Sequence, residues 1–227
     1  FEVDFYRAHG VPVRYVGHPL VDEIERVGLL DQTVTPVTGR LAMLPGSRAM
    51  EVSQLLPVMM MALDRLSRSV VQDAVIVEAP GMGEEIERVL SSCQTDPRVR
   101  RVRGEGRRAE LAGSSLAWTA SGTATLECAL LGVPMVVGYR LRPLSFAIAK
   151  MLVHVPNVAL VNLIAGRTVA PELLQNDWNP GELAGKTVDL ISGGIEAQRT
   201  GLAAVRTRLG APGASRNAAE AVAEYLG

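Results

Sequence analysis

The chain has 227 residues, of which 48% are hydrophobic and 21% charged, and its formal net charge is −1. This composition is typical of a soluble globular domain with an aliphatic core, and the charge balance argues against a general nucleic-acid-binding surface. Cys93 and Cys128 are too few for a disulfide scaffold, and no Cys/His cluster suggests a zinc site. This cysteine usage favours a reducing, cytosolic setting.

The chain begins with Phe1 and shows no signal peptide, so we expect it to be part of a longer protein. The most apolar window, 144–164, is interrupted by charged and polar residues and does not qualify as a membrane span. Residues 141–155 combine an apolar body with basic side chains. Such a segment is compatible with a bilayer interface, but equally with core or subunit packing.

The first elements in chain order are a helix end, a short strand over 13–17 and a turn at His18, followed by a loop over 31–40. From there on, apolar runs typical of buried strands alternate with helical segments. This alternation predicts an α/β fold, a Rossmann-like doubly wound parallel sheet with helices on both faces and extra C-terminal helices. The predicted strands cover 41–46, 74–80, 99–104, 115–121 and 134–140, and the helices cover 50–69, 81–93, 107–115, 123–132, 179–192, 195–209 and 215–226.

Ligands of doubly wound sheets bind beyond the carboxyl ends of the strands, where two glycine-containing turns occur in this chain. In LPGSR, Gly46 allows close backbone approach, Ser47 can donate a hydrogen bond, and Arg48 offers a planar donor fork for phosphate. The alternative is an ordinary strand-to-helix turn with a solvated arginine.

In SGTATLE, Ser121 ends a predicted strand, and Gly122 and Thr123 begin a helix whose free amides attract anions. Glu127 lies four residues past Thr123, about 6 Å along the same helix face. That spacing suits a diphosphate at the helix start and a ribose at the carboxylate. The alternative is a capped helix with Glu127 in water.

Three further features carry weaker signals. NLIAGRTVAPELLQ contains Asn162, Glu172 and Gln175, side chains of the kind that bind sugar hydroxyls, although a loop and one helical turn explain the spacing as well. The basic cluster 97–108 suits either an anionic membrane surface or a solvated edge strand. His18 is either a turn residue or a ligand contact.

The ordered set VGHPLVD, LPGSR, SGTATLE, GVPMVVGYR and NLIAGRTVAPELLQ resembles the lipid-A-disaccharide synthase family over about residues 1–175. The resemblance implies the C-terminal, donor-binding half of a GT-B glycosyltransferase. Such an enzyme transfers 2,3-diacylglucosamine from its UDP carrier to 2,3-diacylglucosamine 1-phosphate, forming a β-1,6 bond and releasing UDP. It also implies a peripheral enzyme on the cytoplasmic face of the inner membrane, a homodimer, and no metal or other cofactor, since the UDP-sugar is a substrate.

By this resemblance, residues 1–30 are the end of the acceptor domain and the hinge, and 31–192 are the UDP-sugar-binding domain. Residues 193–227 are helices that pack on the other half or are exchanged in a dimer. The general base is expected in the N-terminal half, so this chain alone should bind UDP-sugar without turnover. The substrate-binding residues so implied are His18, Gly46, Ser47, Arg48, Ser121, Gly122, Thr123, Glu127, Asn162 and Gln175, with Arg48 also stabilising charge during catalysis.

Two other function classes remain open from the residues. One is another GT-B UDP-sugar enzyme, similar to the peptidoglycan N-acetylglucosaminyltransferase or a UDP-sugar 2-epimerase, which would not be expected to carry NLIAGRTVAPELLQ. The other is a non-catalytic nucleotide-sugar binding module.

Overall fold

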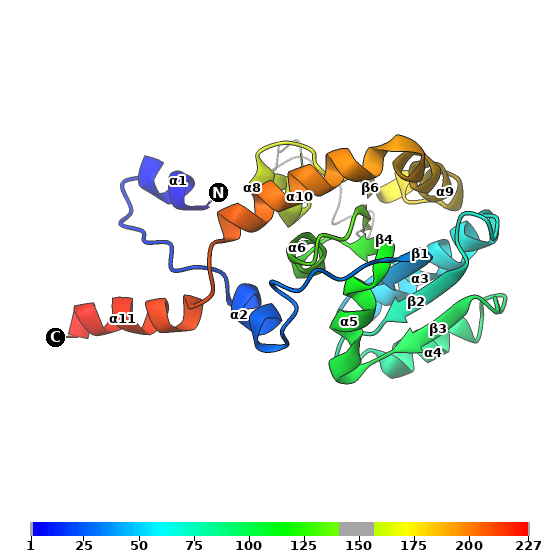
Figure 1. Cartoon of the computed structure of the whole chain (residues 1–227), viewed down its shortest axis with the longest axis horizontal. Helices are drawn as coiled ribbons and strands as arrows, with labels where there is room; N and C mark the ends of the chain where they lie inside the picture. Colours follow the sequence, from blue (N-terminus) through cyan, green and yellow to red (C-terminus); the bar gives the residue numbers. More distant parts are fainter. Residues whose placement is uncertain (1, 141–156, 227) are drawn as a thin grey trace.

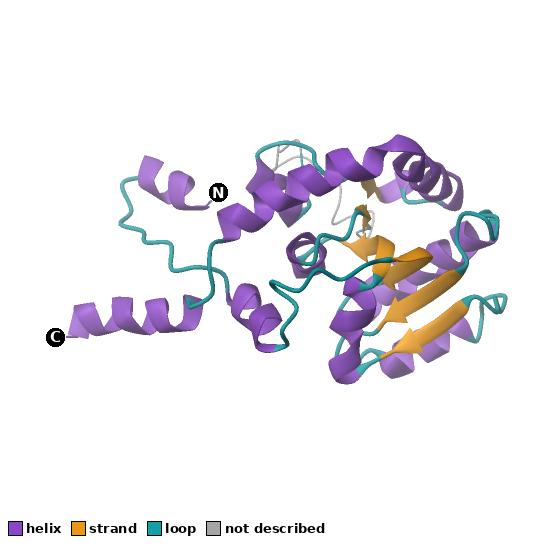
Figure 2. Cartoon of the chain, in the orientation of Figure 1, coloured by secondary structure: helices purple, strands orange, loops and turns teal. Residues whose placement is uncertain are grey.

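A computed structural model describes residues 2–140 and 157–226 of the chain. Its centre is a six-stranded sheet in the order β3-β2-β1-β4-β5-β6, in which every neighbouring pair is parallel. Helices cover both faces of this sheet (Figures 1 and 2). The predicted doubly wound α/β fold is therefore confirmed. The strands are β1 (Val37–Leu44), β2 (Asp73–Val77), β3 (Val99–Val102), β4 (Ser114–Ala120), β5 (Met135–Tyr139) and β6 (Glu172–Leu174).

Helices follow the strands at the predicted places. Between the strands lie α3 (Ala49–Asp64), α4 (Gly83–Leu90), the short η1 (Gly104–Gly106), α5 (Arg107–Ala112), α6 (Thr123–Leu130) and α8 (Leu160–Ala165). The chain begins with α1 (Glu2–Ala8) and α2 (Pro19–Arg26). It ends with η2 (Gln175–Asp177), α9 (Pro180–Asp189), the π-helical η3 (Leu190–Gly194), α10 (Ile195–Leu209) and α11 (Ala214–Leu226).

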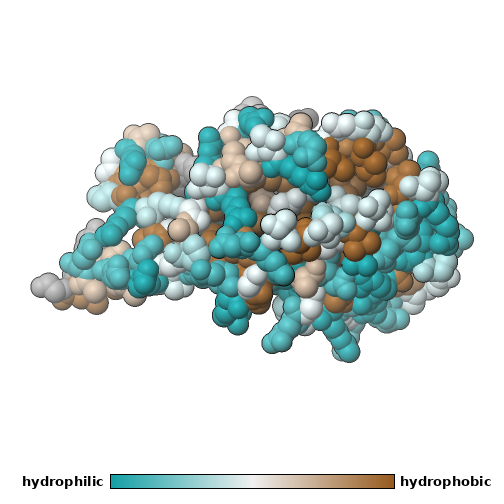
Figure 3. Space-filling model, viewed as in Figure 1, coloured by the Kyte–Doolittle hydropathy of each residue, from teal (hydrophilic) through white to brown (hydrophobic). Residues whose placement is uncertain are grey.

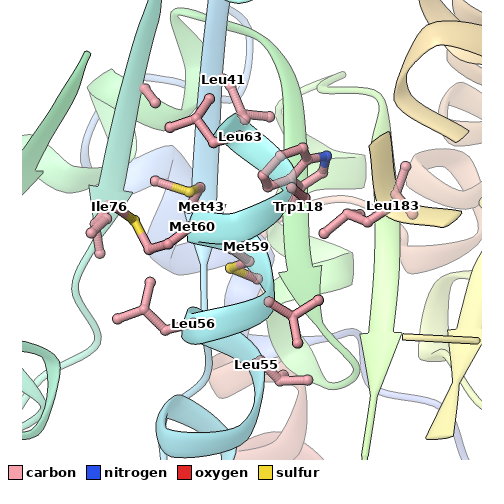
Figure 4. Close-up of a cluster of buried hydrophobic side chains, with 14 of the residues drawn as sticks. Leu41, Met43, Leu55, Leu56, Met59, Met60, Leu63, Ile76, Trp118 and Leu183 are labelled. Carbon is pink, nitrogen blue, oxygen red and sulfur yellow. The ribbon is translucent and has the colours of Figure 1, made fainter. Parts of the chain in front are cut away.

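Strand β1 divides the core into two layers because successive side chains of a strand point to opposite faces. Leu41 and Met43 belong to one buried cluster, which they share with α3, α4 and α9. Ala42 and Leu44 belong to the other, which they share with α2, α6 and α10. Figure 4 shows the first layer, in which side chains of α3 pack onto those of β1 and β2. Burial on both faces explains why the central strands read as unbroken apolar runs.

Two indoles fix the packing near β4 and β5. Trp118 is fully buried, and its Nε1 donates to Thr187 Oγ1 on α9 at 2.8 Å. Trp178 lies against Gly138 of β5, where a Cβ atom would stand 2.4 Å from the indole ring. Gly138 is therefore required by this close approach.

The predicted helix over 50–69 is too long, since α3 ends at Asp64. The buried side chain of Arg98 explains this end. Its guanidinium donates to the carbonyl oxygens of Leu63 and Leu66, each at 2.8 Å, and forms an ion pair with Asp96 at 2.6 Å. A cation on the last carbonyl groups stabilises a helix end.

The predicted strand over 13–17 is wrong, because that segment has no regular secondary structure and joins no sheet. It runs beside the last two helices instead. The Tyr15 hydroxyl donates to the carbonyl of Leu209, and Asn217 Nδ2 donates to the carbonyl of Val16. Strand β6, with three residues, was not predicted.

Helix α11 projects from the domain beside α2 (Figure 1). Asp22 of α2 accepts hydrogen bonds from the amides of Gly213, Ala214 and Ser215, where α11 begins. These bonds, led by those from Gly213 and Ser215, lower the pKa of the Asp22 carboxyl. Hydrophobic side chains remain exposed at this end, including Phe5 on α1. Figure 3 shows a hydrophobic patch in the region of α1.

Within residues 2–140 and 157–226, every helix is too short or too polar to cross a bilayer. The segment 141–155, considered above for a bilayer interface, lies outside the described residues.

Candidate functional site

The strand order reverses between β1 and β4, which is where ligands bind in doubly wound sheets. The LPGSR turn follows β1 and the SGTATLE turn follows β4, so both lie at this point. They line one cavity of about 410 Å³. Of the predicted site residues, this cavity brings together His18, Gly46, Ser47, Arg48, Ser121, Gly122, Thr123 and Glu127.

The first turn is closed by a carboxylate of its own helix. Gly46 has a φ of +124°, and a Cβ atom there would stand 2.5 Å from both Cβ and Oε2 of Glu51. Glu51 Oε2 accepts from the amide of Ser47 at 2.9 Å, and its Oε1 pairs with Arg48 Nη1 at 3.1 Å. The side chain of Arg48 is 78% exposed, so it can turn toward a ligand in the cavity.

The second turn lacks such a carboxylate. Helix α6 has no acidic residue in its first turn, and among the described residues no side chain caps its start at Gly122. The first amides of a helix have no intrahelical partner, and those of Thr123 and Ala124 therefore need an acceptor. Both residues line the cavity. An anion bound here would meet free N–H groups and the positive end of the helix dipole.

Glu127 is buried, and its carboxylate reaches the wall of the cavity. The expected alternative, a carboxylate in water, is therefore wrong. Arg108 Nε donates to Glu127 Oε1 at 2.7 Å, and Arg107 Nη2 lies 3.6 Å from the same oxygen. Arg108 also forms an ion pair with Glu23 of α2. Burial opposes the charged form of Arg108, but the hydrogen bonds to Glu127 and Glu23 outweigh it and raise the pKa of the guanidinium.

His18 has a structural role and a place in the site. It caps α2, with Nδ1 accepting from the amide of Leu20 at 3.2 Å. Since Nδ1 is the acceptor, the ring proton belongs on Nε2, which makes His18 a candidate donor on the cavity wall.

Asn162 and Gln175 do not line this cavity. Asn162 is fully buried, and its Oδ1 accepts from the amides of Val169 and Ala170. Its Nδ2 donates to the carbonyl of Ala170 and to Glu172 Oε1. These four bonds use the whole hydrogen-bonding capacity of the amide and hold the loop between α8 and β6. Gln175 follows β6 in a left-handed conformation, with a φ of 53°.

Sequence reasoning missed four charged residues that line the cavity: Glu23, Glu51, Arg107 and Arg108. The sequence did carry a signal for the two arginines. They follow β3, and the carboxyl end of β3 lies at the same edge of the sheet as the carboxyl ends of β1 and β4, where the ligand is expected. Other arginines of the cluster 97–108 serve the fold. Arg98 binds α3, Arg100 pairs with Asp73 and Glu110, and Arg101 pairs with Glu78 and Glu87.

A larger cavity of about 1450 Å³ adjoins the first and shares its wall at Ala79, Pro80, Arg107 and Arg108. It extends the site over the ends of β2 and β3, where hydrophilic side chains cover most of the surface (Figure 3). A third cavity, of about 840 Å³, lies at the opposite edge of the sheet around residues 92–98.

Known proteins match both the sequence and the fold. The family model described as lipid-A-disaccharide synthetase matches residues 1–224. Lipid-A-disaccharide synthases of Syntrophus aciditrophicus and Myxococcus xanthus are 38% and 40% identical to the chain, covering 96% and 100% of it. The chain spans 59% and 61% of the length of these two relatives.

Solved structures support the fold alone, because their sequence identities are low. The spinosyn forosaminyltransferase matches with a TM-score of 0.54 and 12% identity, covering 85% of this chain and 44% of its own. Anabaena HepE, in complex with UDP and glucose, matches with a TM-score of 0.50 and 15% identity, covering 90% of this chain and 50% of its own. Because the family model matches this chain over almost the whole of its 227 residues, the chain belongs to the lipid-A-disaccharide synthase family.

Proposed function

We propose that this chain supplies the donor-binding half of a lipid A glycosyltransferase. The reaction is transfer of 2,3-diacylglucosamine from UDP to 2,3-diacylglucosamine 1-phosphate, with a β-1,6 bond formed and UDP released. The observation that carries the proposal is the convergence of the turns after β1 and β4, together with Glu127, on one cavity at the switch point of the sheet.

The diphosphate would bind at the start of α6. Among the described residues, no side chain caps the amides there and no carboxylate competes for them, whereas the turn after β1 already holds Glu51. Arg48 faces the same cavity from the other turn and is mostly exposed, so it can exchange Glu51 for a phosphate oxygen. Fixed amides and a guanidinium would then stabilise the charge that grows on UDP as the glycosidic bond breaks.

The ribose would bind at Glu127, which accepts hydrogen bonds from its hydroxyl groups. Glu127 lies one turn further along α6 than the uncapped amides, on the wall of the same cavity. His18, at the start of α2, would donate to the ligand from the same cavity. The assignment of Asn162 and Gln175 to the sugar remains a proposal, and for Asn162 it requires that a ligand replace bonds the loop now uses.

The rest of the enzyme would lie in a preceding half. Residues 1–30 would form the end of the acceptor domain and the hinge, 31–192 the donor domain, and 193–227 a segment that packs on the other half or exchanges in a homodimer. The projection of α11 and the exposed side chains at that end support such a contact (Figure 1). The acceptor side would supply the general base and the approach to the inner face of the inner membrane.

Two alanine variants test the site. Arg48→Ala and Glu127→Ala should each weaken UDP binding by about 1–3 kcal/mol, or about 5- to 150-fold in Kd, by titration calorimetry. Arg199→Ala is the matched control, since Arg199 forms an i,i+3 pair with Glu196 just as Arg48 does with Glu51, but on α10 and away from the cavity. Unchanged affinity in both site variants would contradict the proposal.

Competition between acylated and unacylated UDP-glucosamine tests the substrate class. A chain adapted to the diacylated donor should bind it more tightly than the unacylated sugar nucleotide. Equal affinities would favour a different UDP-sugar enzyme of the same fold.

A further inference from the structure

Within the part of the chain that the structure describes, the carboxylate of Glu127 is engaged through one oxygen only. Arg108 and Arg107 both approach Oε1, at 2.7 Å and 3.6 Å. Among the described residues, no hydrogen bond to Oε2 is found. Because a carboxylate has two oxygens that accept, and because Glu127 lines the cavity, Oε2 is the oxygen left for a ligand.

Arg108 is itself held from two sides. Its side chain is 10% exposed and lies between α6, which carries Glu127, and α2, which carries Glu23. Nη2 pairs with the Glu23 carboxylate, and Nε donates to Glu127. With two carboxylates on its guanidinium, Arg108 is poorly placed to serve a third anion. Its contacts instead fix the torsion of the Glu127 carboxylate, which is otherwise a broad, roughly two-fold rotor.

We propose that Arg108 is a positioning residue for ribose recognition, holding Glu127 Oε1 so that Oε2 accepts from the hydroxyl groups of a nucleoside diphosphate. Glu23 holds Arg108 in turn and so couples α2 to the ribose site. The inference rests on the proposed function, because it takes the ligand to be a ribonucleotide. A positioning role for Arg108 can be distinguished from a direct contact to phosphate by one measurement. A positioning residue sets the preference for a nucleotide with ribose hydroxyl groups over one without them, whereas a phosphate contact sets the affinity for the diphosphate of both.

The experiment compares binding of UDP and of 2′,3′-dideoxy-UDP by calorimetry. The unmodified chain should prefer UDP by about 10-fold or more, the value of a hydrogen bond to a charged group. Arg108→Ala should reduce this preference to within about twofold while changing the affinity for dideoxy-UDP by less than about threefold. Arg100→Ala is the matched control, because Arg100 also pairs with two carboxylates but lines none of the three cavities.

One further variant keeps the test decisive if Arg108→Ala unfolds, and a double variant tests the coupling to Glu127 if Arg108→Ala folds. Glu23→Gln should lower the preference for UDP in part, without weakening dideoxy-UDP binding. Arg108→Ala combined with Glu127→Gln should show no loss of preference beyond that of Glu127→Gln alone. The inference is overturned if Arg108→Ala, or Glu23→Gln where Arg108→Ala does not fold, keeps the full preference for UDP over dideoxy-UDP. It is also overturned if the affinities for the two nucleotides fall equally. If the unmodified chain binds neither nucleotide, the proposed function falls with it.

Discussion

Replacement of Gly46 by alanine tests the geometry of the first turn. The backbone there has a φ of +124°, which costs a residue with a side chain about 1–3 kcal/mol. The new Cβ would stand 2.5 Å from Glu51 Cβ, an atom fixed to the backbone of α3 that no rotamer change removes. Displacing Glu51 would also break its bond to the Ser47 amide, worth about 0.5–1.5 kcal/mol. Together these costs predict a loss of about 1.5–4.5 kcal/mol in the free energy of unfolding.

Urea denaturation measures this loss, and Gly132→Ala isolates its steric part. Gly132 also has a positive φ, +68°, but a Cβ there meets nothing within 4 Å. The control should therefore lose only about 1 kcal/mol, the cost of the left-handed conformation. Gly46→Ala should in addition weaken UDP binding, since the turn moves. If the two variants are equally destabilised, the reasoning about Glu51 is refuted.

Three other changes test the fold. Gly138→Ala should destabilise the chain by about 1–3 kcal/mol through overpacking against the neighbouring indole, and an unchanged urea midpoint would contradict that contact. Arg98→Met should cost about 3–5 kcal/mol, because it removes the buried guanidinium that pairs with Asp96 and donates to the carbonyls of Leu63 and Leu66. A melting temperature within 2 °C of the unmodified chain (roughly 1 kcal/mol or less) would exclude this. The bonds from Gly213 and Ser215 lower the folded-state pKa of Asp22, so its contribution is present above the ordinary carboxyl pKa and is lost as pH falls through the lowered value. Amide exchange at the start of α11, corrected for intrinsic rates, should therefore be faster in acid, and in Asp22→Asn at neutral pH, than in the unmodified chain at neutral pH. Equal protection under these three conditions would contradict the role of Asp22 in holding the start of α11.

The sheet was predictable because its signals are local. Buried parallel strands produce apolar runs, and the helices between them show their own period and turn residues. The convergence of the two turns also followed from the sequence, because the carboxyl ends of parallel strands share one edge. The error over 13–17 has a physical cause: alternating β-branched and aromatic residues suit a strand, but here contacts from Leu209 and Asn217, far along the chain, hold the segment outside the sheet.

The charge partners in the site were not predictable from spacing. Arg108 meets Glu127 because α5 and α6 begin at the same edge of the sheet, and Glu23 joins them from α2, which packs against α6. Similarly, Asn162 looked like a sugar ligand by residue type, yet its bonds to the loop before β6 depend on tertiary folding. Polar residue type predicts that a partner exists, but the fold decides which one.

Amide chemical shifts recorded while UDP is added to the chain test the central claim most directly. The account predicts saturable changes that are largest at residues 46–48 and 121–124, the two turns that line the cavity at the switch point. Absence of saturable change, or changes confined to residues 92–98 at the opposite edge of the sheet, would contradict it.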